Sequence, residues 1–253
     1  MFYCKKSWCI HPIAFIIVLF LLFSSFLPVY VSADQNTGEK IEFSVSEHDP
    51  VLLIHGYLDC YWTPWWNKLS TYLVKEGYNR ENIHIIDLGD NPFKNVDSPE
   101  IYAEILKKEI VNISNSGDTK VDIIAHSMGG LTARWAIEKL NCSCMVDDLV
   151  TLGTPHQGSY VAYFVFNTPG GKDMIPVSEF LLDLNDGDLS AGVEYTAVWG
   201  RLDEFVIPHR YARISGEELN SVEKARNLCV GFYEHVQLVA NKNVFNKYKN
   251  FLD

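Results

Sequence analysis

The sequence predicts an α/β fold, in which a mostly parallel central sheet has helices on both faces. Three observations predict it. Short apolar stretches of strand length alternate along the chain with segments of helical periodicity. One of these stretches, residues 121–126, runs directly into a turn of small residues and then into a helix-forming segment. The chain that follows the first 33 residues, residues 34–253, has a length that suits one domain of this kind.

The first 33 residues have the features of an export signal peptide. Lys5 and Lys6 precede an apolar run over 13–27, and a segment of small residues ends at Ala33. The alternative is an uncleaved membrane anchor, but the run is shorter than the ~20 residues that a membrane-spanning helix needs. We therefore expect cleavage after Ala33 and a secreted mature protein, located outside the cell or in the cell envelope.

The charge of the chain argues against nucleic acid as a partner. There are 32 acidic and 21 basic side chains, which give a formal net charge of −11. A surface of this sign repels phosphate backbones and anionic lipid surfaces. Most of the acidic residues are expected simply to lie in solvent, so the charge says little else about function.

The first half of the mature chain alternates between strands and helices. A capping residue followed by proline marks two helix starts, at Thr63-Pro64 and at Ser98-Pro99. Residues 50–55 are apolar almost throughout, as in the centre of a parallel sheet, whereas 41–45 alternate in the manner of an edge strand. The predicted elements are strands at 41–45, 50–55 and 82–88 and helices at 64–76 and 99–113.

The second half continues this alternation around one long insertion. After the strand at 121–126 the predicted elements are a helix at 131–140, strands at 145–152, 194–200 and 227–231, and a closing helix at 237–252. The segment 157–190 is long for a connection, begins with an aromatic run and contains Pro and Gly. Because its apolar content argues against disorder, we predict a cap over the catalytic edge, with ordinary packing as the alternative.

Residues 125–129 follow the small–x–Ser–x–Gly pattern of a sharp turn between a strand and a helix. Such a turn strains the backbone at Ser127, so its neighbours are small: Ala125, Gly129 and Gly130. The turn would place Ser127 Oγ at the carboxyl edge of the sheet and at a helix N-terminus, where backbone N–H groups can bind an oxyanion. Ser127 is therefore the candidate nucleophile.

A serine nucleophile needs a base and a carboxylate that orients the base. Asp203 follows the strand predicted at 194–200, and His235 follows the last predicted strand. Since the carboxyl ends of parallel strands meet at one edge, we predict that both residues reach Ser127. Glu204 is the alternative acid. His126 is beside Ser127, but its side chain is expected to point away from the hydroxyl.

The sequence also indicates an oxyanion hole. His55, Gly56 and Tyr57 end the first central strand, and glycine there lets the backbone turn its amides towards the site. We predict that the N–H groups of Tyr57 and Met128 form the hole, each contributing ~3 kcal/mol at the transition state. His55 is expected to hold this loop in shape.

Aromatic residues near these positions are candidates for an acyl pocket. Residues 60–66 contain three tryptophans, and the insertion begins with aromatic side chains. Packing of a helix face is the alternative explanation for the tryptophans. The predicted substrate-binding residues are Trp62, Trp65, Tyr160 and Phe164.

Three segments together, residues 51–56, 121–130 and 150–158, resemble the α/β-hydrolase superfamily and, within it, the secreted bacterial class 2 lipases. Ala125 in place of the first elbow glycine is typical of the small secreted lipases in that group. The resemblance implies an α/β-hydrolase fold and hydrolysis of triacylglycerols or other carboxylesters. It also places Asp203 and His235 where the family has its acid and its base. The insertion after Gly158 resembles longer, capped relatives.

The mechanism so predicted is that of a serine hydrolase with an acyl-enzyme intermediate and no cofactor. Its partners would be a lipid or small ester substrate and a lipid–water interface. Because one triad serves all acyl transfers, a thioesterase, amidase or deacylase acting on lipid-modified molecules is an alternative. A non-catalytic binding protein with a hydrolase fold is another, but such a protein has no need of an intact triad.

The cysteines and the acidic residues give weaker expectations. The mature chain has four cysteines, and we favour a disulfide between Cys60 and Cys229, both near the catalytic edge, because export permits disulfides. Cys142 and Cys144 would then pair or stay reduced, and they lack the partners of a zinc site. No metal site is predicted, since the acidic run over 183–188 lacks a full set of calcium ligands.

Overall fold

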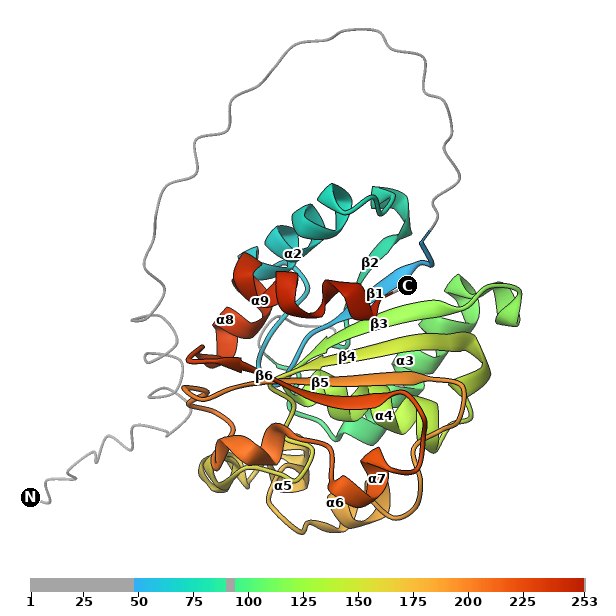
Figure 1. Cartoon of the computed structure of the whole chain (residues 1–253). Helices are drawn as coiled ribbons and strands as arrows, with labels where there is room; N and C mark the ends of the chain where they lie inside the picture. Colours follow the sequence, from blue (N-terminus) through green and yellow to red (C-terminus); the bar gives the residue numbers. More distant parts are fainter. Residues whose placement is uncertain (1–47, 90–93, 253) are drawn as a thin grey trace, which may run out of the picture. The chain divides into compact units, whose positions relative to one another are not determined.

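The core of the molecule is a sheet of six parallel strands in the order β2-β1-β3-β4-β5-β6, which fans across the centre of Figure 1. The computed structural model describes residues 48–89 and 94–252. The strands are β1 (Val51–Ile54), β2 (Ile83–Ile86), β3 (Val121–His126), β4 (Val146–Leu152), β5 (Glu194–Gly200) and β6 (Ala225–Gly231). The predicted α/β class is confirmed. The predicted signal peptide and the strand predicted at 41–45 lie outside the described residues.

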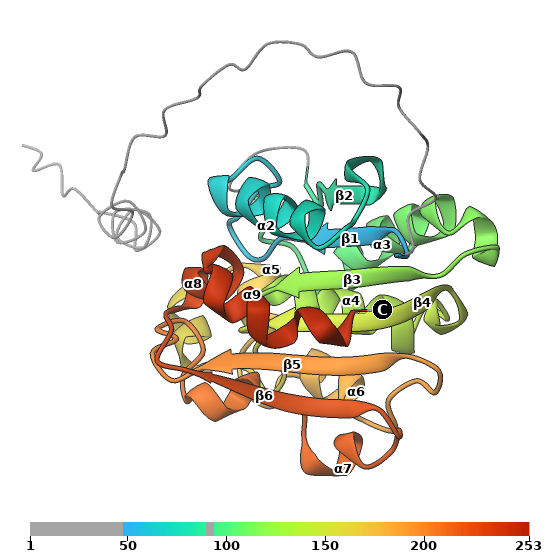
Figure 2. The same cartoon turned by 45° about the horizontal axis from the view of Figure 1, so that its top comes forward.

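Helices cover both faces of the sheet, as Figure 2 shows from a second side. On one face lie α2 (Pro64–Lys75), α8 (His235–Ala240) and α9 (Lys242–Tyr248). On the other lie α3 (Pro99–Ile113), α4 (Met128–Glu138) and α6 (Glu179–Leu184). The remaining short elements are α5 (Pro169–Asp173), α7 (Gly216–Leu219) and the 3-10 turns at Arg80–Asn82, Asn115–Gly117, Ser143–Met145, Tyr160–Val165, His209–Ala212 and Lys249–Phe251. Within the described part of the chain, no helix is long and apolar enough to cross a membrane.

The central strands are apolar on both sides because both sides are covered. All four residues of β1 are fully buried, with Leu52 and Ile54 in the cluster under α3 and α4 and Val51 and Leu53 in the cluster under α2 and α9. This alternation follows from the two-residue period of a strand. It explains why a continuous apolar run, rather than an alternating one, marked this strand in the sequence.

Both proline-marked helices begin where the sequence predicts, but their caps differ. Ser98 Oγ accepts a hydrogen bond from Glu100 N at 3.3 Å, as a capping residue should. Thr63 does not cap α2. Its hydroxyl instead donates to Asp59 Oδ1 at 3.1 Å and to Cys60 O at 3.0 Å, because the preceding loop folds back beneath it.

The prediction of one closing helix over 237–252 is wrong. Asn241 is extended (φ −97°, ψ 123°) and separates α8 from α9. The Asn241 side chain accepts a hydrogen bond from Asn243 N at 2.8 Å and so caps the second helix. Asparagine favours such a local bond over a place inside a helix, which is why the helix breaks there.

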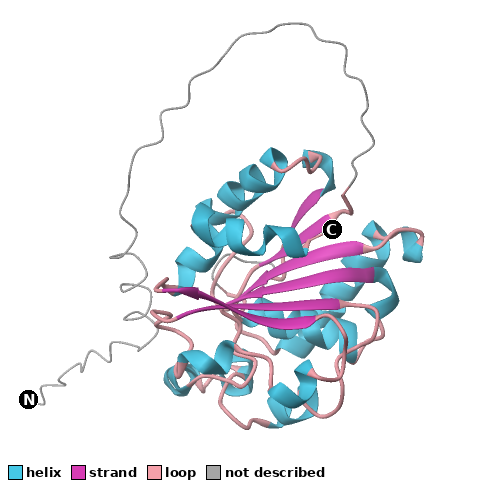
Figure 3. Cartoon of the chain, viewed as in Figure 1, coloured by secondary structure: helices cyan, strands magenta, loops and turns pink. Residues whose placement is uncertain are grey.

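The insertion over 157–190 is built from three short helical segments, the 3-10 turn at Tyr160–Val165, α5 and α6. Figure 3 colours the helices of the chain cyan and the loops that connect them pink. Its inward side joins the core through Ala162, Met174, Phe180, Leu181, Leu184 and Leu189. Its outward side leaves Tyr163, Phe164 and Phe166 more than half exposed. The prediction that the insertion caps the catalytic edge stays a prediction, and the inward contacts show that a large part of it is packed as core.

A buried arginine fastens the insertion to the elbow helix. Arg134 on α4 is fully buried and donates to both carboxylate oxygens of Glu138, at 2.9 and 3.0 Å. It also donates to Glu218 on α7 at 2.5 Å and to Asn185, at the end of α6, at 2.9 Å. Paired acids make burial of the guanidinium tolerable and raise its pKa despite the burial. The insertion and the elbow helix are thereby joined through charged hydrogen bonds.

The predicted bridge between Cys60 and Cys229 is wrong, because all four described cysteines are free. Cys60 is buried in the loop after β1, whereas Cys229 is on β6. Three strands separate β1 from β6 in the sheet, and neighbouring strands are ~4.8 Å apart. A disulfide requires Cα atoms within about 7 Å of each other. Both cysteines lie towards the same edge of the sheet, but that shared edge does not bring them within bonding distance.

Candidate active site

Ser127 occupies a strained turn between β3 and α4. Its φ of 55° and ψ of −130° lie outside the regions that side-chain-bearing residues normally adopt. The turn is fixed by two bonds to β4 and the residues after it: Ser127 N donates to Leu152 O at 2.9 Å, and Thr154 Oγ1 donates to Ser127 O at 2.8 Å. The hydroxyl-bearing residue is partly exposed although its strand is buried throughout.

Glycines after Ser127 are required by close packing rather than by their own dihedral angles. A Cβ on Gly129 would lie 2.5 Å from His55 O, and one on Gly130 would lie 2.0 Å from Thr154 Oγ1. No side chain fits at either position. The elbow can therefore approach both neighbouring strand ends, which brings the loops after β1 and β4 against Ser127.

Asp203 and His235 form a buried pair at the ends of β5 and β6. His235 Nδ1 lies 2.9 Å from both carboxylate oxygens of Asp203. Asp203 Oδ1 also accepts from the backbone N–H groups of Phe205 at 3.0 Å and Val206 at 2.9 Å, which fixes its orientation. Since a carboxylate only accepts, the proton lies on Nδ1, and Nε2 is left with the lone pair that a general base needs.

Glu204, the alternative acid, has a different partner. Its Oε2 accepts a hydrogen bond from the backbone N of His235 at 3.1 Å, not from the imidazole. Burial alone would lower the pKa of His235, but the charge of Asp203 and the hydrogen bond to it raise that pKa above its ordinary value, with a smaller effect from Glu204. Asp203 is thus the residue that contacts the ring.

The residues after β4 bring the three candidates to one place. Leu152 O accepts a hydrogen bond from Ser127 N, and the next residue, Gly153, lies beside the acid–base pair. A Cβ on Gly153 would lie 2.8 Å from Asp203 Oδ2 and 3.0 Å from His235 Nδ1. The elbow and the acid–base pair therefore contact consecutive residues of one short segment at the carboxyl edge of the sheet.

The two residues of the predicted oxyanion hole flank the elbow. A Cβ on Gly56 would lie 2.6 Å from Ser127 Cβ, so the backbone that leads into Tyr57 passes directly beside the nucleophile. Met128 is the first residue of α4, where N–H groups have no partner within the helix. Both backbones are thus next to Ser127, and their role in binding an oxyanion stays a prediction.

Residues 48–247 match the family model described as lipase (class 2). The chain belongs to the class 2 lipase family. The family predicted from the sequence is confirmed.

Curated relatives and solved structures extend this result. The class 2 lipase described here is similar to the triacylglycerol lipases of Pseudarthrobacter phenanthrenivorans and Burkholderia plantarii, each 31% identical over 121 residues. Those alignments cover 46% of this chain and 36% and 32% of the two relatives, so the chain spans about a third of their length.

Solved structures share the fold. Bacillus licheniformis lipase BlEst2 in its mature form has a TM-score of 0.65 at 17% identity, over 84% of this chain and 95% of that one. Aspergillus fumigatus lipase B has a TM-score of 0.60 at 19% identity, over 79% of this chain and 52% of that one. Together they confirm the predicted α/β-hydrolase fold of this lipase-family chain.

His55 holds the loop that follows β1. Its Nε2 accepts a hydrogen bond from Leu88 N at 3.1 Å, so the proton lies on Nδ1, 3.3 Å from Gly56 O. Asn95 Nδ2 donates to the same carbonyl oxygen. Burial lowers the pKa of His55 below its ordinary value, which favours this neutral form. The contacts are those of the structural role predicted for His55.

His126 supports the acid–base pair, a role that the sequence analysis missed. Its Nε2 donates to the backbone carbonyl of His235 over 3.2 Å, and the two rings lie 4.5 Å apart between centroids. Burial, followed by the nearby His235, lowers its pKa well below the ordinary value, so His126 is neutral. The sequence does indicate this position of His126. Side chains two residues apart on a strand lie on the same face, so His126 lies on the face of Ile124, which belongs to the hydrophobic cluster that includes α8.

The four predicted substrate-binding aromatics have different environments. Trp65 is partly buried, and its Nε1 donates to Asp59 Oδ2 at 3.2 Å, so it takes part in the packing that was the alternative. Trp62, Tyr160 and Phe164 are 49%, 51% and 69% exposed. They are available to a ligand, and contact with substrate stays a prediction for all four.

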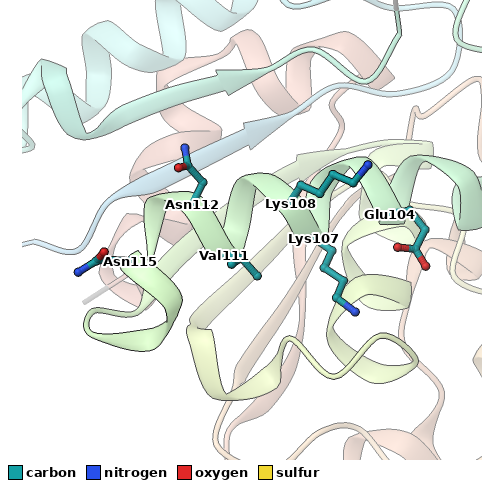
Figure 4. A pocket seen from close by; sticks show the side chains of 6 residues that line it. All are labelled: Glu104, Lys107, Lys108, Val111, Asn112 and Asn115. Atoms are coloured by element: carbon teal, nitrogen blue, oxygen red, sulfur yellow. The ribbon is translucent and has the colours of Figure 1, made fainter.

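Two other hollows lie away from the elbow. One, of about 490 Å³, is formed by side chains from α3 and the residue that follows Ser114, and Figure 4 shows them: Glu104, Lys107, Lys108, Val111, Asn112 and Asn115. The other, of about 760 Å³, lies on the insertion beside Pro176 and Tyr211. Neither contains Ser127 or His235. Within residues 48–89 and 94–252, no group of three or more His, Cys, Asp or Glu could hold a metal ion.

Proposed function

We propose that this chain is a secreted serine carboxylester hydrolase, a lipase that cleaves acylglycerols or other fatty-acyl esters. The observation that carries the proposal is the buried contact of 2.9 Å between His235 Nδ1 and Asp203 at the same sheet edge as the strained Ser127. Family membership and the similarity to triacylglycerol lipases support the substrate class. The signal-peptide pattern in the sequence of residues 1–33 supports secretion.

The reaction begins when His235 Nε2 takes the proton of Ser127 as Oγ attacks the ester carbonyl carbon. The electron pair of the C=O bond moves to the oxygen, which the N–H groups of Tyr57 and Met128 bind. The tetrahedral intermediate then collapses, the C–O bond to the alcohol breaks, and His235 returns the proton to the leaving alcohol. Asp203 stabilises the imidazolium throughout.

The second half repeats these steps with water. His235 takes a proton from a water molecule, which attacks the acyl carbon. The intermediate collapses by breaking the bond to Ser127 Oγ, which regains its proton from His235, and the carboxylic acid is released. Every group that moves a proton in this cycle is in the acid–base pair or on Ser127.

The exposed aromatic side of the insertion supports contact with a lipid–water interface. Tyr163, Phe164 and Phe166 are 54%, 69% and 64% exposed on or directly after one 3-10 turn. Large apolar side chains left together in solvent mark a surface that binds something apolar. The net charge of −11 favours an uncharged ester surface over an anionic one.

The test is a combination of labelling and hydrolysis. The mature protein is treated with a fluorophosphonate probe and assayed on p-nitrophenyl esters of increasing chain length, below and above their solubility limits, beside Ser127→Ala. We expect one label on Ser127, hydrolysis that Ser127→Ala lacks, and a rise in rate above the solubility limit. Labelling of any other residue would contradict the proposed chemistry. Smooth saturation through the limit would contradict the interface alone, and faster cleavage of matched thioesters would favour a thioesterase.

A further inference from the structure

The start of α5 contacts both residues of the predicted oxyanion hole. The first contact is a hydrogen bond of 2.7 Å between the Tyr57 hydroxyl and Thr168 Oγ1. Thr168 Oγ1 also lies 2.9 Å from Val165 O and 3.2 Å from Gly171 N. Since a carbonyl only accepts, Thr168 donates its one proton to Val165 O, and Tyr57 must be the donor in the pair with Thr168. The direction of the bond is therefore defined.

The second contact is between Gly170 and Met128. A Cβ on Gly170 would lie 2.9 Å from Met128 Sδ and 2.5 Å from Asp97 O, so only a glycine allows this approach. Gly170 N donates to Val96 O at 2.8 Å, which fixes the backbone at that place. The insertion is thus pressed onto the side chain of the residue whose N–H begins α4.

These contacts lead to one inference, which rests on the proposed function. We infer that Thr168 and Gly170 are positioning residues that set the geometry of the oxyanion hole, Thr168 through the Tyr57 hydroxyl and Gly170 through the Met128 side chain. An oxyanion donor acts only when it lies 2.7–3.1 Å from the oxygen that becomes charged. The loop that carries Tyr57 includes Leu58 at a φ of 53° and has no helix or strand of its own. Asn95 bonds its backbone at Gly56 and Leu58, and Thr168 of the insertion bonds the Tyr57 side chain.

The inference gives the insertion a function beyond covering the site. A lid that opens freely would break the bond between Tyr57 and Thr168 each time. A segment whose first turn positions the oxyanion donors must stay in place during the reaction. The exposed 3-10 turn over Tyr160–Val165 is then the part of the insertion that meets substrate, and the start of α5 is fixed.

The hydrogen bond is tested with Tyr57→Phe, Thr168→Val and the double variant, assayed on p-nitrophenyl butyrate. Loss of the bond moves a donor that acts in the transition state, so we expect kcat to fall about tenfold with KM within about twofold. The double variant should fall no further than either single variant, because the same bond is lost. Thr168→Ser retains a hydroxyl and should restore kcat. Thr71→Val, which removes an exposed hydroxyl bonded only to Asn67 O at 2.8 Å within α2, is the matched control and should be unchanged.

The packing contact is tested with Gly170→Ala. The added methyl must displace Met128 or the backbone at Asp97, and we expect kcat to fall at least tenfold. Gly216→Ala is the matched control, because a Cβ there meets nothing within 4 Å. The pH at which kcat/KM is half-maximal should not move in any of these variants, since Asp203 and His235 are not touched. Melting temperature is measured alongside, and a parallel loss of activity and of folded protein in Gly170→Ala leaves Tyr57→Phe as the deciding variant.

Failure of this inference and failure of the proposed function, on which it rests, would give different results in these assays. Wild-type protein without label or hydrolysis would overturn the proposed function. Active wild-type protein with unchanged kcat in Tyr57→Phe and Thr168→Val would overturn the inference alone. So would losses that multiply in the double variant, or a rise in KM with kcat unchanged, which would make the pair a substrate contact.

Discussion

The acid–base pair and the oxyanion loop lie on opposite sides of Ser127 in the strand order, and they are held by different kinds of contact. Asp203 and His235 follow neighbouring strands, β5 and β6, and they are held by their bond to each other and by the Val206 N–H in the loop after β5. Tyr57 comes from β1 and is bonded to Thr168, 111 residues away in the chain. The acid–base side is built from loops at neighbouring strand ends, whereas the oxyanion side has a residue bonded directly to the insertion.

Because of this difference, we expect the two sides of the site to tolerate substitutions in the insertion to different degrees. Asp203 and His235 bond directly to each other from neighbouring strand ends, so this contact depends less on segments outside the sheet. The oxyanion side is bonded to the insertion through the Tyr57 side chain itself. The insertion reaches the acid–base side less directly, through the loop after β5, where Ser159 Oγ donates to Phe205 O at 2.7 Å and accepts from Ile207 N at 3.1 Å. Variants on the two sides should therefore fail in different ways.

The largest effect is expected for residues that act as one unit on the acid–base side. Ser127→Ala and His235→Ala should each lower kcat by about 10⁶, because removal of either disables the whole proton transfer. The measurement is single-turnover hydrolysis of a p-nitrophenyl ester, with melting curves to verify folding. A loss in His235→Ala of less than 100-fold would mean that another residue is the base.

A smaller effect on kcat distinguishes the two candidate acids, Asp203 and Glu204. Asp203→Asn should lower kcat by about 10⁴, since an amide no longer holds the imidazole in the required tautomer. Glu204→Gln should lose less than about tenfold, because it contacts only the backbone N of His235. Inactivity of Glu204→Gln with an active Asp203→Asn would reverse the assignment.

The pH profile of the same pair of variants follows from the direction of the His235 shift. Protonated His235 cannot accept the Ser127 proton, so kcat/KM falls as the pH drops through the pKa of His235. Asp203 holds that pKa above its ordinary value of about 6.5. The acid limb of Asp203→Asn should therefore move to lower pH, whereas that of Glu204→Gln should move much less.

The smallest effect on kcat is expected for His126, which contacts His235 of the acid–base pair. His126→Phe keeps an aromatic ring against His235 but removes the hydrogen bond to its carbonyl, a loss of ~1 kcal/mol, or about fivefold in kcat. His84→Phe, on the edge strand β2 away from the elbow, is the matched control. Equal rates for His126→Phe and wild type would show that the strand ends alone position His235.

The elements predicted from sequence were those that depend on local pattern. Proline at the first helical position gave both helix starts, and apolar runs gave the strands, since each signal lies within a few residues. The break at Asn241 was missed although asparagine disfavours helix interiors, because the cap that it gives to Asn243 shows only in the structure. Asp203 and His235 were brought together as predicted because position at a strand end follows from strand order.

The contacts that the sequence could not predict join distant segments. Tyr57 and Thr168 are ordinary residues in their own stretches, and only the packed structure places their hydroxyls 2.7 Å apart. The same limit explains the wrong bridge between Cys60 and Cys229, for which the distance across the sheet was unknown. The role of a residue cannot be predicted from one sequence when it depends on a contact with a distant residue whose position is unknown.

The bond between Tyr57 and Thr168 has a consequence for loop grafting within the family. An insertion taken from a relative would arrive with its own residue at the position of Thr168, while the host would keep Tyr57. If the two residues do not form a hydrogen bond, the transplanted segment would change access of the substrate to the site and would also lower kcat. A single activity assay would not distinguish these two effects. A graft that carries residues 56–58 together with 157–190 would transfer the bond between Tyr57 and Thr168 intact, so a mismatch at that bond would not contribute to its turnover.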